Sequence, residues 1–143
     1  ENILIHEFAH AIHEMGLSSV DRTFDTRLKE AYRSAMKAGL WKGAYASTNR
    51  MEYWAEVVQS WFDTNRENDN QHNHVDLRSE LKEYDPTAAA LCEEIFGDGP
   101  WRYVHPTQRS HEPHLKDIDR DSLPTFRWAA GMEEAYQANP SPQ

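Results

Sequence analysis

Two histidines and a glutamate near the start of the chain have the spacing of a catalytic metal site. His6, Glu7 and His10 form a His-Glu-x-x-His motif. On a helix, four residues turn by about 40° and rise about 6 Å, so both imidazoles face one point. Zinc accepts neutral imidazole nitrogens, and a catalytic zinc keeps one position open for water. The motif predicts that His6 and His10 bind zinc and that Glu7 acts as the general base on water.

The motif alone does not settle the question, because shuffling a chain of this composition would produce it roughly four times in a hundred. A third ligand must come from another segment. The class with a third His six residues after His10 is excluded, since that position is Gly16. Glu30 has about the spacing of the thermolysin-like class, but Lys29 and Ser34 replace the Asn and Asp expected beside it. A solvated helix face is the simpler interpretation of Glu30.

Glu52 is the better candidate for the third ligand. It begins a strongly aromatic segment, and Glu56 lies one helical turn further on the same face. Glu52 could then bind the metal while Glu56 accepts a hydrogen bond from a ligand imidazole. Spacing alone equally allows a capping box, in which Glu52 reaches back to the backbone N–H of Asn49. The residues leave these two alternatives open.

Hydrophobic periodicity and capping residues predict a mainly helical chain without a convincing strand. Ile3, Leu4, Phe8 and Ile12 are expected to belong to a buried helix that ends at Gly16. Asn49 is the expected N-cap of the aromatic helix. The remaining helices are expected near 23–38, 77–84, 86–96 and 126–136, with Gly39 and Gly97 as C-terminal stops and a polar loop over 63–76.

Composition limits the possible partners. The net charge of −9 argues against nucleic-acid binding, which requires clustered Lys and Arg. No apolar run approaches the roughly 20 residues of a membrane span. Cys92 is the single cysteine, so no internal disulfide can form, and a small buried side chain is its expected role.

The segment from Tyr45 to Glu56 resembles the second signature of the anthrax lethal factor family of gluzincins, which includes secreted Pro-Pro endopeptidases. It reads Tyr-Ala-Ser-Thr-Asn-Arg-Met-Glu-Tyr-Trp-Ala-Glu. The first signature, His-Glu-Phe-Ala-His, is similar too, with Ala9 where relatives carry Gly. The resemblance covers about residues 3–62. It favours Glu52 over Glu30 as the third ligand.

Carried over by position, the resemblance implies that His6, His10 and Glu52 bind one zinc ion. Glu7 would be the general base, and the Tyr45 phenol would stabilise the oxyanion. The residues implied to support the ligands from outside are Glu56 and Asn49.

The resemblance also implies a zinc-dependent endopeptidase with peptide or protein substrates, secreted from the cell. Residues 1–143 would form a single zincin-like catalytic domain or its C-terminal part. The usual upstream β-sheet would be largely absent. Separately from the resemblance, the Asn-Pro-Ser-Pro-Gln end predicts a frayed tail over residues 137–143. Two alternatives stay open, namely a catalytically silent zinc-binding interaction module and a zinc hydrolase that acts on a non-peptide amide.

Weaker signals lie outside this region. Asp117, Asp119 and Asp121 are spaced like the start of a calcium loop, but the turn Gly and the bidentate Glu are missing, so a solvated turn is the default. His13 is expected to flank the site without binding metal. The other histidines are expected to be scattered on the surface, namely His72, His74, His105, His111 and His114.

Overall fold

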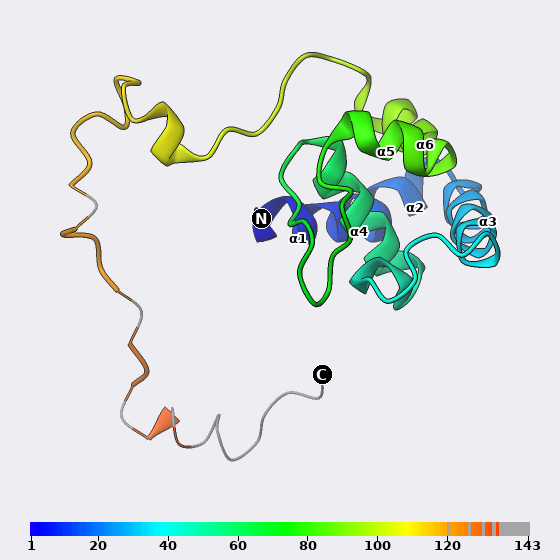
Figure 1. Ribbon diagram of the computed structural model, residues 1–143, viewed down its shortest axis with the longest axis horizontal. Coiled ribbons are helices and arrows are strands. Elements are labelled where there is room, and N and C mark those ends of the chain that lie inside the picture. The colour runs from blue at the N-terminus through cyan, green and yellow to red at the C-terminus, as the bar shows by residue number, and fades with distance from the viewer. Residues whose placement is uncertain (120, 126, 130, 133, 135–143) are drawn as a thin grey trace. The chain divides into compact units, whose positions relative to one another are not determined.

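The computed structural model describes residues 1–119, 121–125, 127–129, 131–132 and 134. These residues form helices and loops without a strand, so the prediction of a mainly α chain is confirmed. Contacts divide the chain into two units, Glu1–Val104 and His105–Gln143. The elements of the first unit, labelled in Figure 1, are α1 (Ile3–Ala11), the π-helix η1 (Ile12–Leu17), α2 (Ser18–Val20), α3 (Phe24–Lys37), the 3-10 helix η2 (Tyr45–Ser47), α4 (Arg50–Trp61), α5 (Arg78–Tyr84) and α6 (Pro86–Phe96).

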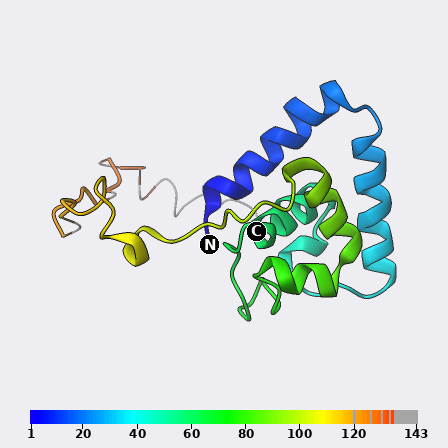
Figure 2. The ribbon, with the colours of Figure 1, turned by 90° about the horizontal axis from the view of Figure 1, so that it is seen from above.

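Helix α4 is the centre of the first unit. Every residue from Tyr53 to Trp61 is buried, and α4 contacts α1, α3, α5, α6 and η2. Asn49 is the predicted N-cap, and its Oδ1 accepts hydrogen bonds from the backbone N–H groups of Met51 and Glu52. Figure 2 shows a long helical segment, made of α1, η1 and α2, that meets α3 at a turn, with the later helices in the angle between them.

The first helical segment is longer than predicted. It continues through η1 and α2 to Val20, so the expectation that it ends at Gly16 is wrong. A glycine ends a helix by adopting a left-handed conformation. Gly39 has a φ of 77° and Gly97 a φ of 68° with an extended ψ of 168°, both of which favour glycine, but Gly16 keeps a negative φ. The helix also gains by continuing, because Leu17 is buried in the core.

The apolar residues at the start of α1 are not in the core. Ile3, Leu4 and Phe8 are 54%, 64% and 59% exposed, which contradicts the expectation that they are buried, and Ile12 is partly buried. The helix turns a different stripe toward α4, and its buried members are His6, Ala9, His13 and Leu17. The interior face of α1 is therefore the histidine face.

A buried carboxylate fixes α6 to the centre of the fold. Asp85 is the predicted N-cap of α6, and its Oδ1 accepts a hydrogen bond from the backbone of Ala88. Its Oδ2 accepts hydrogen bonds from Trp41 Nε1 at 3.0 Å and from the Tyr53 hydroxyl at 2.6 Å. Cys92, further along α6, is fully buried, as expected.

The second unit contains the short 3-10 helix η3 (Pro106–Arg109) followed by turns. Asp117, Asp119 and Asp121 are exposed, and the Asp121 N–H donates to Asp119 Oδ1, as in a solvated turn. The predicted helix over 126–136 lies partly outside the described residues, and the predicted frayed tail at 137–143 lies wholly outside them.

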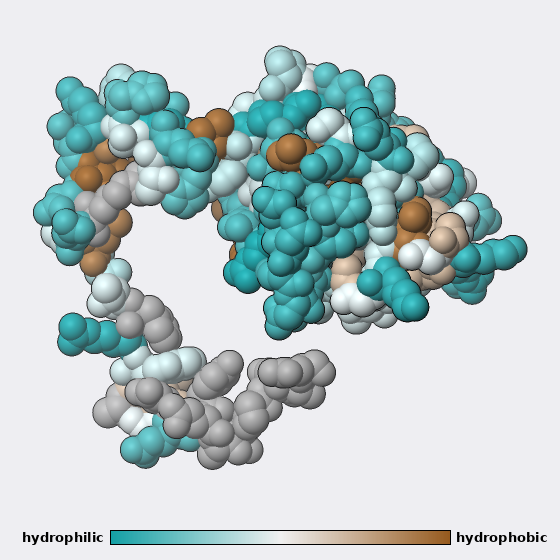
Figure 3. Space-filling model, viewed as in Figure 1, coloured by the Kyte–Doolittle hydropathy of each residue, from teal (hydrophilic) through white to brown (hydrophobic). Residues whose placement is uncertain are grey.

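The surface agrees with the acidic, polar composition. The face of the helical unit seen in Figure 3 is mostly hydrophilic, with small separate hydrophobic areas. None of the helices in the described part of the chain has both the length and the apolar character needed to cross a membrane.

Candidate metal centre

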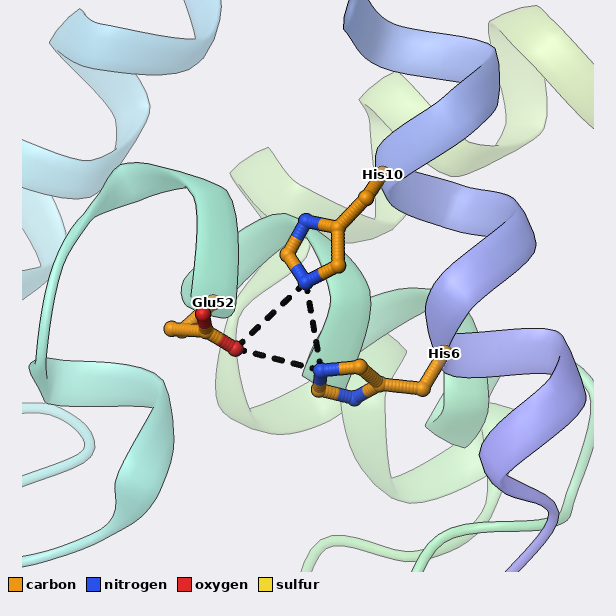
Figure 4. Close-up of side chains that lie close together, drawn as sticks. All are labelled: His6, His10 and Glu52. Atoms are coloured by element: carbon orange, nitrogen blue, oxygen red, sulfur yellow. Dashed lines mark hydrogen bonds and ion pairs between the residues drawn. The ribbon is translucent and has the colours of Figure 1, made fainter. Parts of the chain in front are cut away.

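Three side-chain atoms of the kinds that bind metals, contributed by two helices, lie close together. His6 Nε2 lies 3.1 Å from Glu52 Oε2, His10 Nε2 lies 3.5 Å from the same oxygen, and the two Nε2 atoms are 3.3 Å apart. Figure 4 shows both imidazoles projecting from α1 toward the carboxylate on α4. Among the described residues, this is the one group of three or more His, Cys, Asp or Glu side chains that lie close enough together to bind a metal ion.

Helix geometry explains why the two imidazoles lie close together. His6 and His10 are one turn apart on α1, and their rings meet edge to face with centroids 4.9 Å apart. Between them, the Ala9 carbonyl accepts a hydrogen bond of 3.0 Å from Trp54 Nε1. This buried contact fixes α1 against α4 at the level of the histidines.

The third atom comes from Glu52, whose side chain is not needed to cap α4. The side chain of Asn49 already caps the helix, and the Glu52 backbone N–H is one of its two donors. The Glu52 carboxylate does not cap the helix, and its Oε2 faces the imidazoles of His6 and His10. Of the two arrangements that the spacing left open, the structure has the one that brings Glu52 to the histidines.

The far side of the His6 ring is held by buried acceptors. Nδ1 lies 2.8 Å from Gln59 Oε1 and 3.4 Å from Glu56 Oε1. An imidazole that donates from Nδ1 presents its Nε2 lone pair to a metal. Burial opposes protonation, but contacts with Glu56 and Gln59 and the charges of Glu56 and Glu52 raise the pKa of His6 from 6.5 to about 9.

Tyr45 lies beside the His6 ring, and Glu7 follows His6 in the chain. The ring centroid of Tyr45 is 6.3 Å from that of His6, and the Tyr45 backbone N–H donates to the Gln71 carbonyl at 2.7 Å. Burial raises the pKa of the Tyr45 phenol, and the negative charges of Glu52, Glu56 and Glu7 raise it further. Glu7 itself is exposed, next to His6 on α1.

Sequence reasoning missed two residues behind the ligands. Gln59 is fully buried at His6 Nδ1, and His72 was expected on the surface, yet its side chain is only 6% exposed. The expectation for His72 is wrong because the 63–76 loop folds back on α4, which places His72 Nε2 3.5 Å from Glu56 Oε2. Gln59 carried a signal, since it follows Glu56 by three residues on a helix whose other members are mostly apolar.

Other candidates lie apart from this group. Glu30 is exposed on α3 and lines a cavity of about 440 Å³ between α3 and α6. His13 is buried but pairs with Asp25 Oδ1 at 3.1 Å, outside the three ligand atoms, as expected. The histidines that are exposed, as expected, are His74, His105, His111 and His114.

Comparisons with known proteins identified no similar protein. No family model, no curated protein and no solved structure matches the chain. The resemblance to the lethal factor family therefore stays a prediction that rests on the two signatures.

Proposed function

We propose that this chain is a zinc-dependent endopeptidase in which His6, His10 and Glu52 bind the metal. One observation carries the proposal, namely the separations of 3.1, 3.3 and 3.5 Å among the three ligand atoms. Nitrogen and oxygen ligands at about 2.0–2.1 Å from a tetrahedral zinc are about 3.3 Å from one another. Three protein ligands leave the fourth position open, as a hydrolytic site requires.

The surrounding side chains have the properties that peptide hydrolysis needs. When bound, zinc would polarise the substrate carbonyl and lower the pKa of a water molecule. Glu7 is accessible to water and substrate, so it can accept a proton from the attacking water and pass it to the leaving amine. Gln59 and Glu56 hold the His6 ring, which keeps its Nε2 directed at the site.

Tyr45 supplies a hydrogen-bond donor for the charge that develops on the carbonyl oxygen. Its phenol has a raised pKa and stays protonated at neutral pH. Tyr45 is 38% exposed, so a substrate can reach it. A neutral donor fixed beside the metal centre fits the role of stabilising an oxyanion.

The test is digestion of a peptide library by purified, zinc-loaded protein. We expect cleavage by the wild type, and a severe loss in Glu7→Gln with zinc content unchanged. Glu14→Gln is the matched control, because Glu14 is an exposed glutamate further along the same helical segment. A zinc-loaded protein that cleaves no peptide would reject the proposal in favour of the interaction module or the hydrolase of another amide.

A further inference from the structure

The 63–76 loop has a defined shape although it lacks regular secondary structure. Asp63 and Asn68 adopt left-handed conformations, with φ of 54° and 52°. The Asn68 N–H donates to the Asn73 carbonyl at 2.8 Å, and Asn65 Nδ2 donates to the backbone carbonyl of Glu56 at 3.3 Å. These bonds close the loop on itself and attach it to α4.

Within this loop, one carboxylate sets the orientation of His72. Asp69 Oδ1 accepts three contacts of 2.8 Å, from the backbone N–H groups of Gln71 and His72 and from His72 Nδ1. With Nδ1 engaged by Asp69, the opposite edge of the ring faces α4. His72 Nε2 then lies 3.5 Å from Glu56 Oε2.

Glu56 connects this loop to the metal centre. Its Oε1 lies 3.4 Å from His6 Nδ1, and its Oε2 faces His72 and accepts a hydrogen bond from Asn65 Nδ2 at 3.1 Å. The side chains of Glu56 and His72 are 4% and 6% exposed. Because water is largely excluded, these contacts are stronger than the same contacts on a surface. A continuous series of polar contacts therefore runs from Asp69, which is partly exposed, to the buried side chains of His72, Glu56 and His6.

We propose that His72 is a positioning residue of the metal centre, which holds the Glu56 carboxylate in the orientation that fixes the His6 ring. The inference rests on the proposed function, since it assigns His72 to the same metal site. Gln71, the residue before His72, contacts the backbone of Tyr45, because its carbonyl accepts a hydrogen bond from the Tyr45 N–H. The loop therefore contacts both Glu56, which supports the His6 ring, and the backbone of Tyr45.

The test compares His72→Ala with His72→Gln and with the control His74→Ala. The amide N–H of a Gln reaches the place of His72 Nε2, whereas His74 is an exposed histidine two residues away. We expect zinc affinity to fall about 10- to 100-fold in His72→Ala, to recover in His72→Gln and to stay unchanged in His74→Ala. The visible spectrum of the cobalt-substituted protein should change in the same order.

A second readout uses the metal-free protein. The ring nitrogen resonances of His6 should shift in His72→Ala and stay in place in His74→Ala. If zinc binds His72→Ala as tightly as the wild type and the His6 resonances do not move, His72 has no positioning role, while the proposed function stands. If the wild type binds no zinc but the His6 resonances respond to His72→Ala, the positioning holds and the proposed function fails.

Discussion

Titration of His6 in the metal-free protein offers a quantitative test of the site's electrostatics. Burial of the ring lowers its pKa, but contacts with Glu56 and Gln59 and the charges of Glu56 and Glu52 outweigh burial and raise the pKa from 6.5 to about 9. We therefore expect His6 to be protonated at neutral pH when no metal is present. A zinc ion must displace that proton before it can bind Nε2.

The size of the effect follows from the pKa of about 9. At pH 7 the proton reduces the apparent zinc affinity by about 100-fold, and this penalty shrinks about tenfold for each pH unit up to 9. The stability of the metal-free protein changes with pH in the opposite direction, because it falls as the pH rises. A folded-state pKa above the unfolded value of 6.5 contributes about 3 kcal/mol of stability, fully present below pH 6.5 and lost as the pH rises through about 9.

Nuclear magnetic resonance of the imidazole protons measures this pKa directly. Glu56→Gln removes a nearby negative charge and should lower the pKa of His6, whereas Glu30→Gln, on α3, should leave it unchanged. Addition of zinc should abolish the titration. A His6 ring that titrates near 6.5 in the metal-free wild type would refute the arrangement of Glu52 and Glu56 around it.

Three further substitutions test the site and the fold. Tyr45→Phe should lower kcat about 100-fold with little change in KM or zinc content, because only the oxyanion donor is removed; an unchanged kcat in steady-state assays would remove Tyr45 from catalysis. Asp85→Ala should lower the free energy of unfolding by about 3 kcal/mol or more, since it removes a helix cap and leaves the buried donors of Trp41 and Tyr53 without an acceptor. Tyr53→Phe, which removes one of those bonds, should cost only about 1 kcal/mol in urea titrations, and equal losses would contradict the role of Asp85.

Local chemistry made several helix boundaries predictable. Gly39 and Gly97 stop helices because they reach the left-handed region, and Asn49 and Asp85 cap helices through their own side chains. Each of these devices acts within a few residues of the chain. Gly16 failed as a stop because the burial of Leu17, a tertiary effect, favours continuing the helix.

Side-chain burial was harder to predict. Ile3, Leu4 and Phe8 are apolar at helical spacing, yet α1 buries the face that carries His6 and Ala9 and leaves these three residues exposed. Periodicity shows that a face exists but does not show what covers it.

The three residues grouped at the centre of the site could be predicted from the sequence. His6, His10 and Glu52 carry a spacing signal and come together in the structure. His72 reaches Glu56 through an irregular loop, whose path depends on the hydrogen bonds of Asp69 and Asn65. No short-range pattern encodes such a path, so the role of His72 becomes visible only in the folded structure.

The most direct test of the metal centre is the zinc content of purified protein and of two matched variants. The wild type should retain about one zinc per chain, Glu52→Ala should lose most of it, and Glu30→Ala should retain it. Circular dichroism confirms that each variant is folded. A folded wild type that takes up no zinc, or a Glu52→Ala variant that retains zinc while Glu30→Ala loses it, would contradict the proposed ligand set.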